Sequence, residues 1–280
     1  MAVARRAAVL GSPIGHSLSP VLHTAAYRAL GLTDWRYEAI ECDEAALPAL
    51  VGSMGPEWAG LSLTMPLKRS VLPLLDRTDP VAADVGAANT VIFKNEQRLG
   101  YNTDVSGIVA AMRQAGVTSE GNVLVLGSGA TACSALAALV SCGTTRVAVA
   151  VRALPRARPL IEVAARLGVG VELIELGSAL VSARWDLLIS TIPASGAEPL
   201  ARQLVAGSLS AAAVFDVIYD PWPTPLAEAA EKAGALVISG YELLVQQAVG
   251  QVELMTGQQP PVEAMHAAGL AELERRHAAR

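Results

Sequence analysis

The fold is decided by a short stretch in the middle of the chain, which reads Asn122-Val123-Leu124-Val125-Leu126-Gly127-Ser128-Gly129-Ala130-Thr131-Ala132. An apolar, β-branched strand enters a glycine-rich turn, and an alanine-rich helix follows to Val140. Gly127 permits the tight turn, Gly129 lets the backbone approach a pyrophosphate, and Ala132 lets the helix pack closely on the strand. The N–H groups at the helix start would bind phosphate. A plain strand–helix turn punctuated by glycines is the alternative interpretation.

The next predicted strand, Arg146–Val151, indicates which cofactor is bound. An enzyme that uses NAD usually carries an acidic residue at the end of this strand, where it binds the ribose 2′-hydroxyl. Here Arg152 ends the strand, and Arg156 and Arg158 lie close behind it. Guanidinium groups bind a 2′-phosphate, and no acid is present to repel one. We therefore expect NADP; an exposed helix start in an arginine-rich protein is the alternative.

Alternation of strands and helices continues on both sides of this turn. Further apolar strands are predicted at Val169–Glu172, Asp186–Ile192, Ala213–Val217 and Ala235–Ile238. Helical stretches between such strands are typical of a parallel, doubly wound sheet. Upstream, the sequence predicts strands over residues 7–10, 35–40 and 60–64, and a hairpin over residues 89–102. Helices are expected to begin at Ser19 and Asp104, to span residues 45–52 and to follow Pro66, and two more helices are expected to end the chain.

The predicted fold class is therefore α/β with two domains. The first is an N-terminal α/β substrate domain, residues 1–104, completed by C-terminal helices in residues 240–280. The second is a Rossmann-type, doubly wound parallel-sheet NADP domain over residues 105–239.

Composition narrows the class of protein further. The 280 residues are 52% hydrophobic and carry a net charge of −5, which argues against a general nucleic-acid or membrane-surface protein. Cys42, Cys133 and Cys142 lack the spacing of a disulfide framework or a zinc site, so we expect no metal and a reducing cytoplasm. No apolar run reaches the roughly 18 residues of a membrane span. The apolar run after Arg5-Arg6 is too short for a signal sequence.

Four residues stand out as chemical candidates. Ser17 and Ser19 flank a helix start, where two hydroxyl donors beside the positive end of a helix could bind a carboxylate; alternatively, Ser19 simply caps the helix. Lys68 and Asp104 could form a proton-handling pair, because a partly buried lysine near a carboxylate can be tuned toward the working pH. Taken singly, Lys68 is typical of a surface lysine and Asp104 of a helix cap.

A set of motifs in a fixed order resembles those of the shikimate dehydrogenase family, and the resemblance covers essentially the whole chain. The motifs are Gly11-x-Pro13-x-x-His16-Ser17-x-Ser19-Pro20-x-x-His23, Thr64-x-Pro66-x-Lys68, Gly86-Ala87-x-Asn89-Thr90, Asn102-Thr103-Asp104-x-x-Gly107, Asp216-x-x-Tyr219-x-Pro221-x-x-Thr224-Pro225-Leu226 and Gly240-x-x-x-Leu244-x-x-Gln247. Several such motifs flanking one nucleotide-binding turn are more specific than any one of them.

The resemblance implies reversible, NADPH-dependent reduction of 3-dehydroshikimate to shikimate in aromatic amino acid (chorismate) biosynthesis. Lys68 and Asp104 would be the catalytic residues that handle the proton. The substrate would be bound by Ser17, Ser19, Ser62, Thr64, Asn89, Tyr219 and Gln247. The cofactor would be bound by Gly127, Ser128, Gly129, Ala130, Thr131, Arg152, Arg156, Ile192 and Gly240. A small-molecule substrate and a homodimer are the expected partners.

Three positions depart from the family pattern. Family members commonly carry Asn where Thr24 and Ser62 stand, and frequently Asn where Val151 stands. Ser62 is shorter than Asn but could still donate a hydrogen bond. Two other functions stay open: a quinate/shikimate or aminoshikimate dehydrogenase paralogue, and a ligand-binding homologue without turnover. The intact Lys68 and Asp104 argue against the second.

Overall fold

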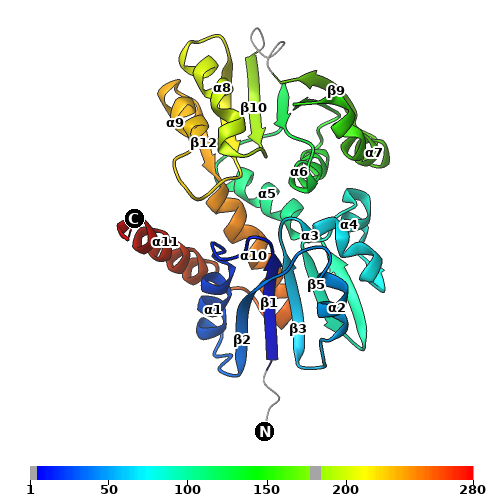
Figure 1. Ribbon diagram of the computed structural model, residues 1–280. Helices are drawn as coiled ribbons and strands as arrows, with labels where there is room; N and C mark the ends of the chain where they lie inside the picture. Colours follow the sequence, from blue (N-terminus) through cyan, green and yellow to red (C-terminus); the bar gives the residue numbers. More distant parts are fainter. Residues whose placement is uncertain (1–4, 177–183, 280) are drawn as a thin grey trace. The chain divides into compact units, whose positions relative to one another are not determined.

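The computed structural model describes residues 5–176 and 184–279 of the chain (Figure 1). The chain divides into two compact units, one formed by Met1–Thr103 with Val245–Arg280 and the other by Asp104–Leu244. Each unit contains its own six-stranded sheet. The α/β class predicted from the alternating pattern is therefore confirmed.

The sheet of the first unit is mixed, and its strands lie in the order β2-β1-β3-β5-β6-β4. The strands are β1 (Arg5–Gly11), β2 (Trp35–Glu41), β3 (Trp58–Leu63), β4 (Arg77–Thr78), β5 (Thr90–Lys94) and β6 (Gln97–Tyr101). β1 pairs in parallel with β2 and β3, whereas β5 pairs antiparallel with β3 and β6. The predicted hairpin is β5 and β6, and its turn residues Asn95 and Glu96 have positive φ values of 52° and 61°.

Helices cover both faces of this sheet. The helices of this unit are α1 (Ser19–Ala29), α2 (Leu47–Gly52), α3 (Leu67–Ser70), α4 (Pro80–Val85), α10 (Gly240–Thr256) and α11 (Val262–Ala278), which packs against α1, with a 3-10 turn at Leu72–Leu74. Side chains alternate along β1, so Ala8 and Leu10 join one hydrophobic cluster and Ala7 and Val9 join the other. Every residue of β3 is buried, as expected for a strand with both faces covered.

The sheet of the second unit is entirely parallel, in the order β12-β11-β10-β7-β8-β9. Its strands are β7 (Val123–Leu126), β8 (Arg146–Val151), β9 (Gly170–Glu175), β10 (Arg184–Ser190), β11 (Ser210–Asp216) and β12 (Leu236–Ser239). Its helices are α5 (Thr103–Gln114), α6 (Ala130–Ser141), α7 (Arg158–Leu167), α8 (Ala194–Val205) and α9 (Pro225–Lys232), with a 3-10 turn at Leu154–Ala157. Counted from β7, this is the 3-2-1-4-5-6 order of a Rossmann sheet, as predicted.

Two short elements, β4 and α4, fall outside the predictions. The sequence does carry a signal for α4. Asp79 caps the helix by accepting hydrogen bonds from the Ala82 and Val81 N–H groups at 3.1 and 3.2 Å, and Pro80 follows at the first helical position. Gly86 ends the helix at a φ of 65°.

Candidate active site

The loop between β1 and α1 carries the two candidate serines. The Ser17 hydroxyl oxygen accepts a hydrogen bond from the Ser19 N–H at 3.2 Å. α1 begins at Ser19 itself, Leu18 occupies the N-cap position, and no side chain caps the helix. The alternative in which Ser19 serves as the helix cap is therefore wrong, because Ser19 lies one residue too late. Ser19 is buried, with 5% of its surface exposed.

A chain of buried hydrogen bonds runs from Tyr37 across the sheet to α10. The Tyr37 hydroxyl donates to Ser62 Oγ at 2.6 Å, and the Ser62 hydroxyl donates to Gln251 Oε1 at 2.7 Å. Gln251 Nε2 then donates to Thr90 Oγ1 at 3.1 Å and to the Asn89 carbonyl oxygen at 3.3 Å. Burial raises the pKa of Tyr37 well above its usual range, so the phenol stays a donor.

His23 completes this buried chain. Its ring stacks on Tyr37 with a centroid separation of 3.9 Å, and Nε2 lies 3.3 Å from Gln251 Oε1. Burial lowers the pKa of His23 to about 3, so the imidazole is neutral at physiological pH. Within the described residues, no group of three or more His, Cys, Asp or Glu side chains could hold a metal ion.

The position of Ser62 limits what it can offer a substrate. Its hydroxyl proton is donated to Gln251 and one lone pair accepts from Tyr37, which leaves one lone pair for another partner. Ser62 can therefore accept a hydrogen bond while this chain is intact, but it cannot also donate one. Substrate contact at Ser62 stays a prediction.

Neither Tyr37 nor Gln251 is predicted from the motifs. A signal for Gln251 exists, because it lies four residues after Gln247 and so shares a face of α10 with it. The sequence offers no comparable signal for Tyr37, whose partners Ser62 and His23 lie on other elements.

Asn89 organises a second group of candidates. Its Nδ2 donates to Thr103 Oγ1 at 2.9 Å and to Gln247 Oε1 at 3.4 Å, and its Oδ1 accepts from the Thr103 N–H at 2.8 Å. Asn102 Nδ2 donates to the Ala87 carbonyl at 2.9 Å. These bonds fix the start of α5, where Asp104 lies in the first turn and is 4% exposed. Asp104 is therefore within the helix rather than its cap.

Thr64 and Lys68 lie on the segment that leaves β3. The Thr64 N–H donates to the Leu10 carbonyl at 2.9 Å, and the Leu67 N–H donates back to the Thr64 carbonyl at 2.8 Å. The Lys68 carbonyl accepts from the Ala88 N–H at 2.8 Å, so the half-buried Lys68 is held next to the loop that leads into β5. The pairing of Lys68 with Asp104 stays a prediction.

In the second unit, the glycine turn leaves β7 next to the end of β10. The strand order reverses between these two strands, which is where ligands bind in such sheets. Gly127 has a φ of +104°, and a Cβ there would lie 2.7 Å from Thr191 Oγ1 and 3.0 Å from Ile192 Cγ2. Thr191 Oγ1 donates to the Leu126 carbonyl at 2.6 Å, which joins the two strand ends.

The start of α6 leaves room for a phosphate group. A Cβ on Gly129 would meet no atom within 4 Å, and no side chain caps the helix. Ser128 Oγ donates to the Arg156 carbonyl at 3.2 Å, which ties the glycine turn to the segment after β8. Arg152 and Arg156 are both exposed there. Open backbone, N–H groups at a helix start and nearby guanidinium groups fit a phosphorylated dinucleotide.

Two further motifs of the sequence begin where β11 and β12 end, at Asp216 and Gly240. The buried Asp216 carboxylate accepts from Thr224 Oγ1 at 2.6 Å, and Thr224 in turn caps α9 through the Ala227 N–H at 3.0 Å. Burial raises the pKa of Asp216. These bonds span the loop that carries Tyr219. Gly240 begins α10, and a Cβ there would lie 2.1 Å from the Val217 carbonyl oxygen, so this position requires glycine.

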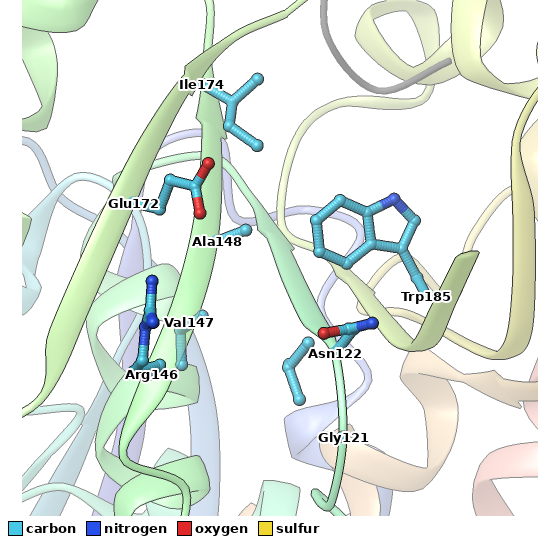
Figure 2. Close-up of a pocket in the computed structure, with 9 residues that line it drawn as sticks. Gly121, Asn122, Arg146, Val147, Ala148, Glu172, Ile174 and Trp185 are labelled. Atoms are coloured by element: carbon cyan, nitrogen blue, oxygen red, sulfur yellow. The ribbon is translucent and has the colours of Figure 1, made fainter. Parts of the chain in front are cut away.

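A hollow of about 520 Å³ lies elsewhere in this unit, on one face of its sheet (Figure 2). Its lining includes Asn122, Arg146, Glu172 and Trp185. Asn122 and Arg146 mark the amino ends of β7 and β8, whereas the glycine turn leaves the carboxyl end of β7. The hollow is therefore separate from the candidate cofactor site.

Comparison with known proteins connects this geometry to a family. The profile for the shikimate dehydrogenase substrate binding domain matches residues 9–91, and the profile for the shikimate 5'-dehydrogenase C-terminal domain matches residues 240–268. A curated relative from Methanococcoides burtonii, named shikimate dehydrogenase (NADP(+)), is 37% identical over 92% of this chain and 94% of its own length. The chain belongs to the shikimate dehydrogenase family. The resemblance inferred from the motifs is therefore confirmed.

Solved structures of this family share the fold. Shikimate dehydrogenase from Mycobacterium tuberculosis is 44% identical, with a TM-score of 0.86 over 95% of this chain and 99% of its own. The Thermus thermophilus enzyme, solved in complex with NADP(H) and shikimate, is 30% identical, with a TM-score of 0.81 over 95% of this chain and 99% of its own. Among the described residues of the present chain, no helix is long and apolar enough to cross a membrane.

Proposed function

We propose that the protein catalyses the reversible, NADPH-dependent reduction of 3-dehydroshikimate to shikimate. The observation that carries the proposal is the Asn89-centred group, which joins Gln247 to the turn before Asp104 by hydrogen bonds of 2.8 to 3.4 Å. A ring that carries several hydroxyls needs several polar side chains held in fixed positions. Curated relatives named shikimate dehydrogenase (NADP(+)) support the same reaction and cofactor.

The substrate would be oriented by the serines of the loop between β1 and α1 and by the polar side chains around Asn89. Ser17 and Ser19 would donate to the carboxylate, beside the positive end of α1. The ring hydroxyls would meet Thr64, Asn89, Gln247 and Tyr219, with Ser62 as an acceptor. Lys68 and Asp104 would contact the hydroxyl beside the reacting carbon and handle the proton.

The cofactor would be bound by the second unit. Backbone N–H groups of Gly127, Ser128, Gly129, Ala130 and Thr131 would meet the pyrophosphate, and Arg152 and Arg156 the 2′-phosphate. Ile192 and Gly240 would border the nicotinamide. When bound, the nicotinamide supplies the hydride, so the protein has to orient two reactants and manage one proton.

Initial rates with shikimate or quinate, each with NADP or NAD, test this function through the absorbance of the reduced nicotinamide. We expect the highest kcat/KM with shikimate and NADP. A preference for quinate or NAD would identify the paralogue instead. Shikimate binding without turnover would identify a ligand-binding homologue. The expected homodimer and cytoplasmic location are part of the same proposal, and light scattering of the purified protein tests the dimer.

A further inference from the structure

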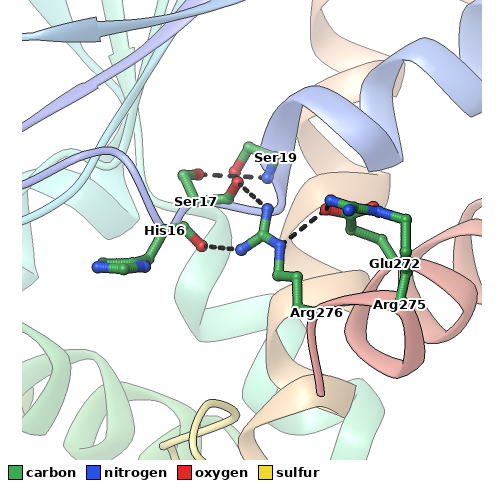
Figure 3. A network of polar contacts seen from close by, with 6 residues as sticks. All are labelled: His16, Ser17, Ser19, Glu272, Arg275 and Arg276. Carbon is green, nitrogen blue, oxygen red and sulfur yellow. Dashed lines mark hydrogen bonds and ion pairs between the residues drawn. The ribbon is translucent and has the colours of Figure 1, made fainter. Parts of the chain in front are cut away.

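The C-terminal helix reaches back to the loop that carries Ser17. Arg276, in α11, donates from Nη1 to the His16 carbonyl oxygen at 2.8 Å and from Nη2 to the Ser17 carbonyl oxygen at 3.4 Å (Figure 3). Arg276 and His16 are 260 positions apart in the sequence. One guanidinium therefore joins two consecutive carbonyls of the loop between β1 and α1.

Glu272 orients this guanidinium. Its Oε1 accepts from Arg276 Nε at 2.8 Å, one helical turn away, so the two Nη atoms are directed at the loop. Both side chains are largely buried, with Arg276 19% exposed and Glu272 17% exposed. Hydrogen bonds from Arg275 and Arg276 lower the pKa of the Glu272 carboxyl to about 2, so it remains ionised throughout the physiological range.

Arg275 offers a built-in comparison. It donates to both Glu272 oxygens at 2.8 Å, from Nε and Nη2, yet its side chain is 69% exposed and none of its described hydrogen bonds reaches the loop. The two adjacent arginines therefore share one carboxylate partner, and they differ in whether they contact the loop.

We propose that Arg276 is a positioning residue for the carboxylate of the substrate, and that Glu272 holds Arg276 in place. The inference rests on the proposed function, in which Ser17 and Ser19 bind that carboxylate. By fixing the His16 and Ser17 carbonyls, Arg276 fixes the Ser17 side chain, which accepts from the Ser19 N–H at 3.2 Å.

If Arg276 has this role, its loss should change the KM for shikimate but not kcat. The carboxylate lies away from the reacting carbon, so weaker carboxylate binding raises KM with little change in kcat. For Arg276→Ala we expect the KM for shikimate to rise about tenfold, kcat to stay within about twofold, and the KM for NADP to stay unchanged. Arg276→Lys should recover part of the loss, because a single ammonium can replace one of the two hydrogen bonds.

Arg275→Ala is the matched control and should leave all three constants near their wild-type values. The Arg276→Ala protein should fold, because Met265 and Leu273 anchor α11 in the core. The methyl ester of shikimate, which lacks the carboxylate charge, distinguishes lost carboxylate binding from general damage to the fold. With this neutral ester, the ratio of the Arg276→Ala KM to the wild-type KM should fall well below the ratio measured with shikimate.

Equal effects of Arg276→Ala and Arg275→Ala on the KM for shikimate would overturn the proposal. So would an Arg276→Ala enzyme in which kcat and both KM values worsen together with the melting temperature, since α11 would then act only on stability. If the wild-type protein showed no turnover, the proposed function would fail first. Calorimetric titration with shikimate would then still compare the two variants, and absence of wild-type binding would overturn both proposals.

Discussion

The two units form their candidate sites from different parts of the chain. In the first unit, the side chains of Gln247 and Gln251 form hydrogen bonds with buried side chains that lie 158 to 228 positions away in the sequence. In the second unit, the candidate site is mostly backbone, at the neighbouring ends of β7 and β10 and in the segment after β8. Side chains can distinguish one polar ring from another, whereas glycine-rich backbone binds any pyrophosphate. We therefore propose that the first unit supplies most of the substrate-binding side chains and that the second unit binds the cofactor.

The largest expected effect is on kcat when Lys68 is replaced, with no change in cofactor binding. Lys68→Ala should lower kcat by about 100-fold or more, because it removes a proton-handling group, while the Kd of NADPH stays unchanged. Steady-state rates and a fluorescence titration with NADPH measure the two quantities. Lys94→Ala, an exposed lysine at the end of β5, is the control. A fully active Lys68→Ala enzyme would remove Lys68 from the mechanism.

A smaller effect is expected when the buried polar chain of the first unit is interrupted. Gln251→Leu leaves Ser62, Thr90 and His23 without a shared partner, which should lower the free energy of unfolding by about 1–3 kcal/mol. Denaturant titration measures this change, with the exposed Gln258→Leu as the control. A loss no larger than that of the control would show that the chain contributes nothing to stability.

Cofactor selection in the second unit depends on arginine. Arg152→Ala should raise the KM for NADP about tenfold and leave the KM for NAD unchanged, because only NADP carries the 2′-phosphate. Arg158 forms an ion pair with Glu162 at 3.1 Å, so Arg158→Ala should change the KM for NADP less. An equal rise with both cofactors would place Arg152 outside the 2′-phosphate site.

The smallest effect at neutral pH concerns His23. Its pKa is about 3 in the folded protein and about 6.5 when unfolded, so the unfolded state alone gains this proton as the pH falls through that window. His23 should therefore reduce stability below pH 6.5 by up to about 1.4 kcal/mol per pH unit. Denaturant titrations at several pH values should show a shallower acid decline for His23→Gln than for the wild type. Parallel declines would mean that His23 does not titrate in this way.

The difference between the local backbone site of the second unit and the long-range side-chain contacts of the first also explains what the sequence could predict. The cofactor turn is a local pattern, so β7 and β8 are predicted within one residue of their observed bounds. β9 extends to Glu175, beyond the predicted Glu172, because it is an edge strand that alternates in exposure and carries charged residues to its end. Farther from the glycine turn, β10 and β11 begin two and three residues before their predicted starts, so the bounds are most accurate for the two strands next to that turn.

The substrate side was only partly predictable. The motifs contain Ser17, Asn89 and Gln247, and the structure joins the last two directly. Tyr37 and Gln251 satisfy the Ser62 hydroxyl, but their roles depend on how β2, β3 and α10 pack together. Such long-range packing leaves no signal for Tyr37 in a single sequence, and for Gln251 it leaves only the four-residue spacing from Gln247. Arg276 escapes prediction for the same reason.

The most direct test of the division between the two units is a pair of calorimetric titrations on two variants. Gly129→Ala introduces a Cβ where the free protein has room, so it should weaken NADPH binding and leave shikimate binding unchanged. Ser17→Ala should weaken shikimate binding and leave NADPH binding unchanged. Equal loss of both ligands in either variant, or loss of the opposite ligand, would contradict the account.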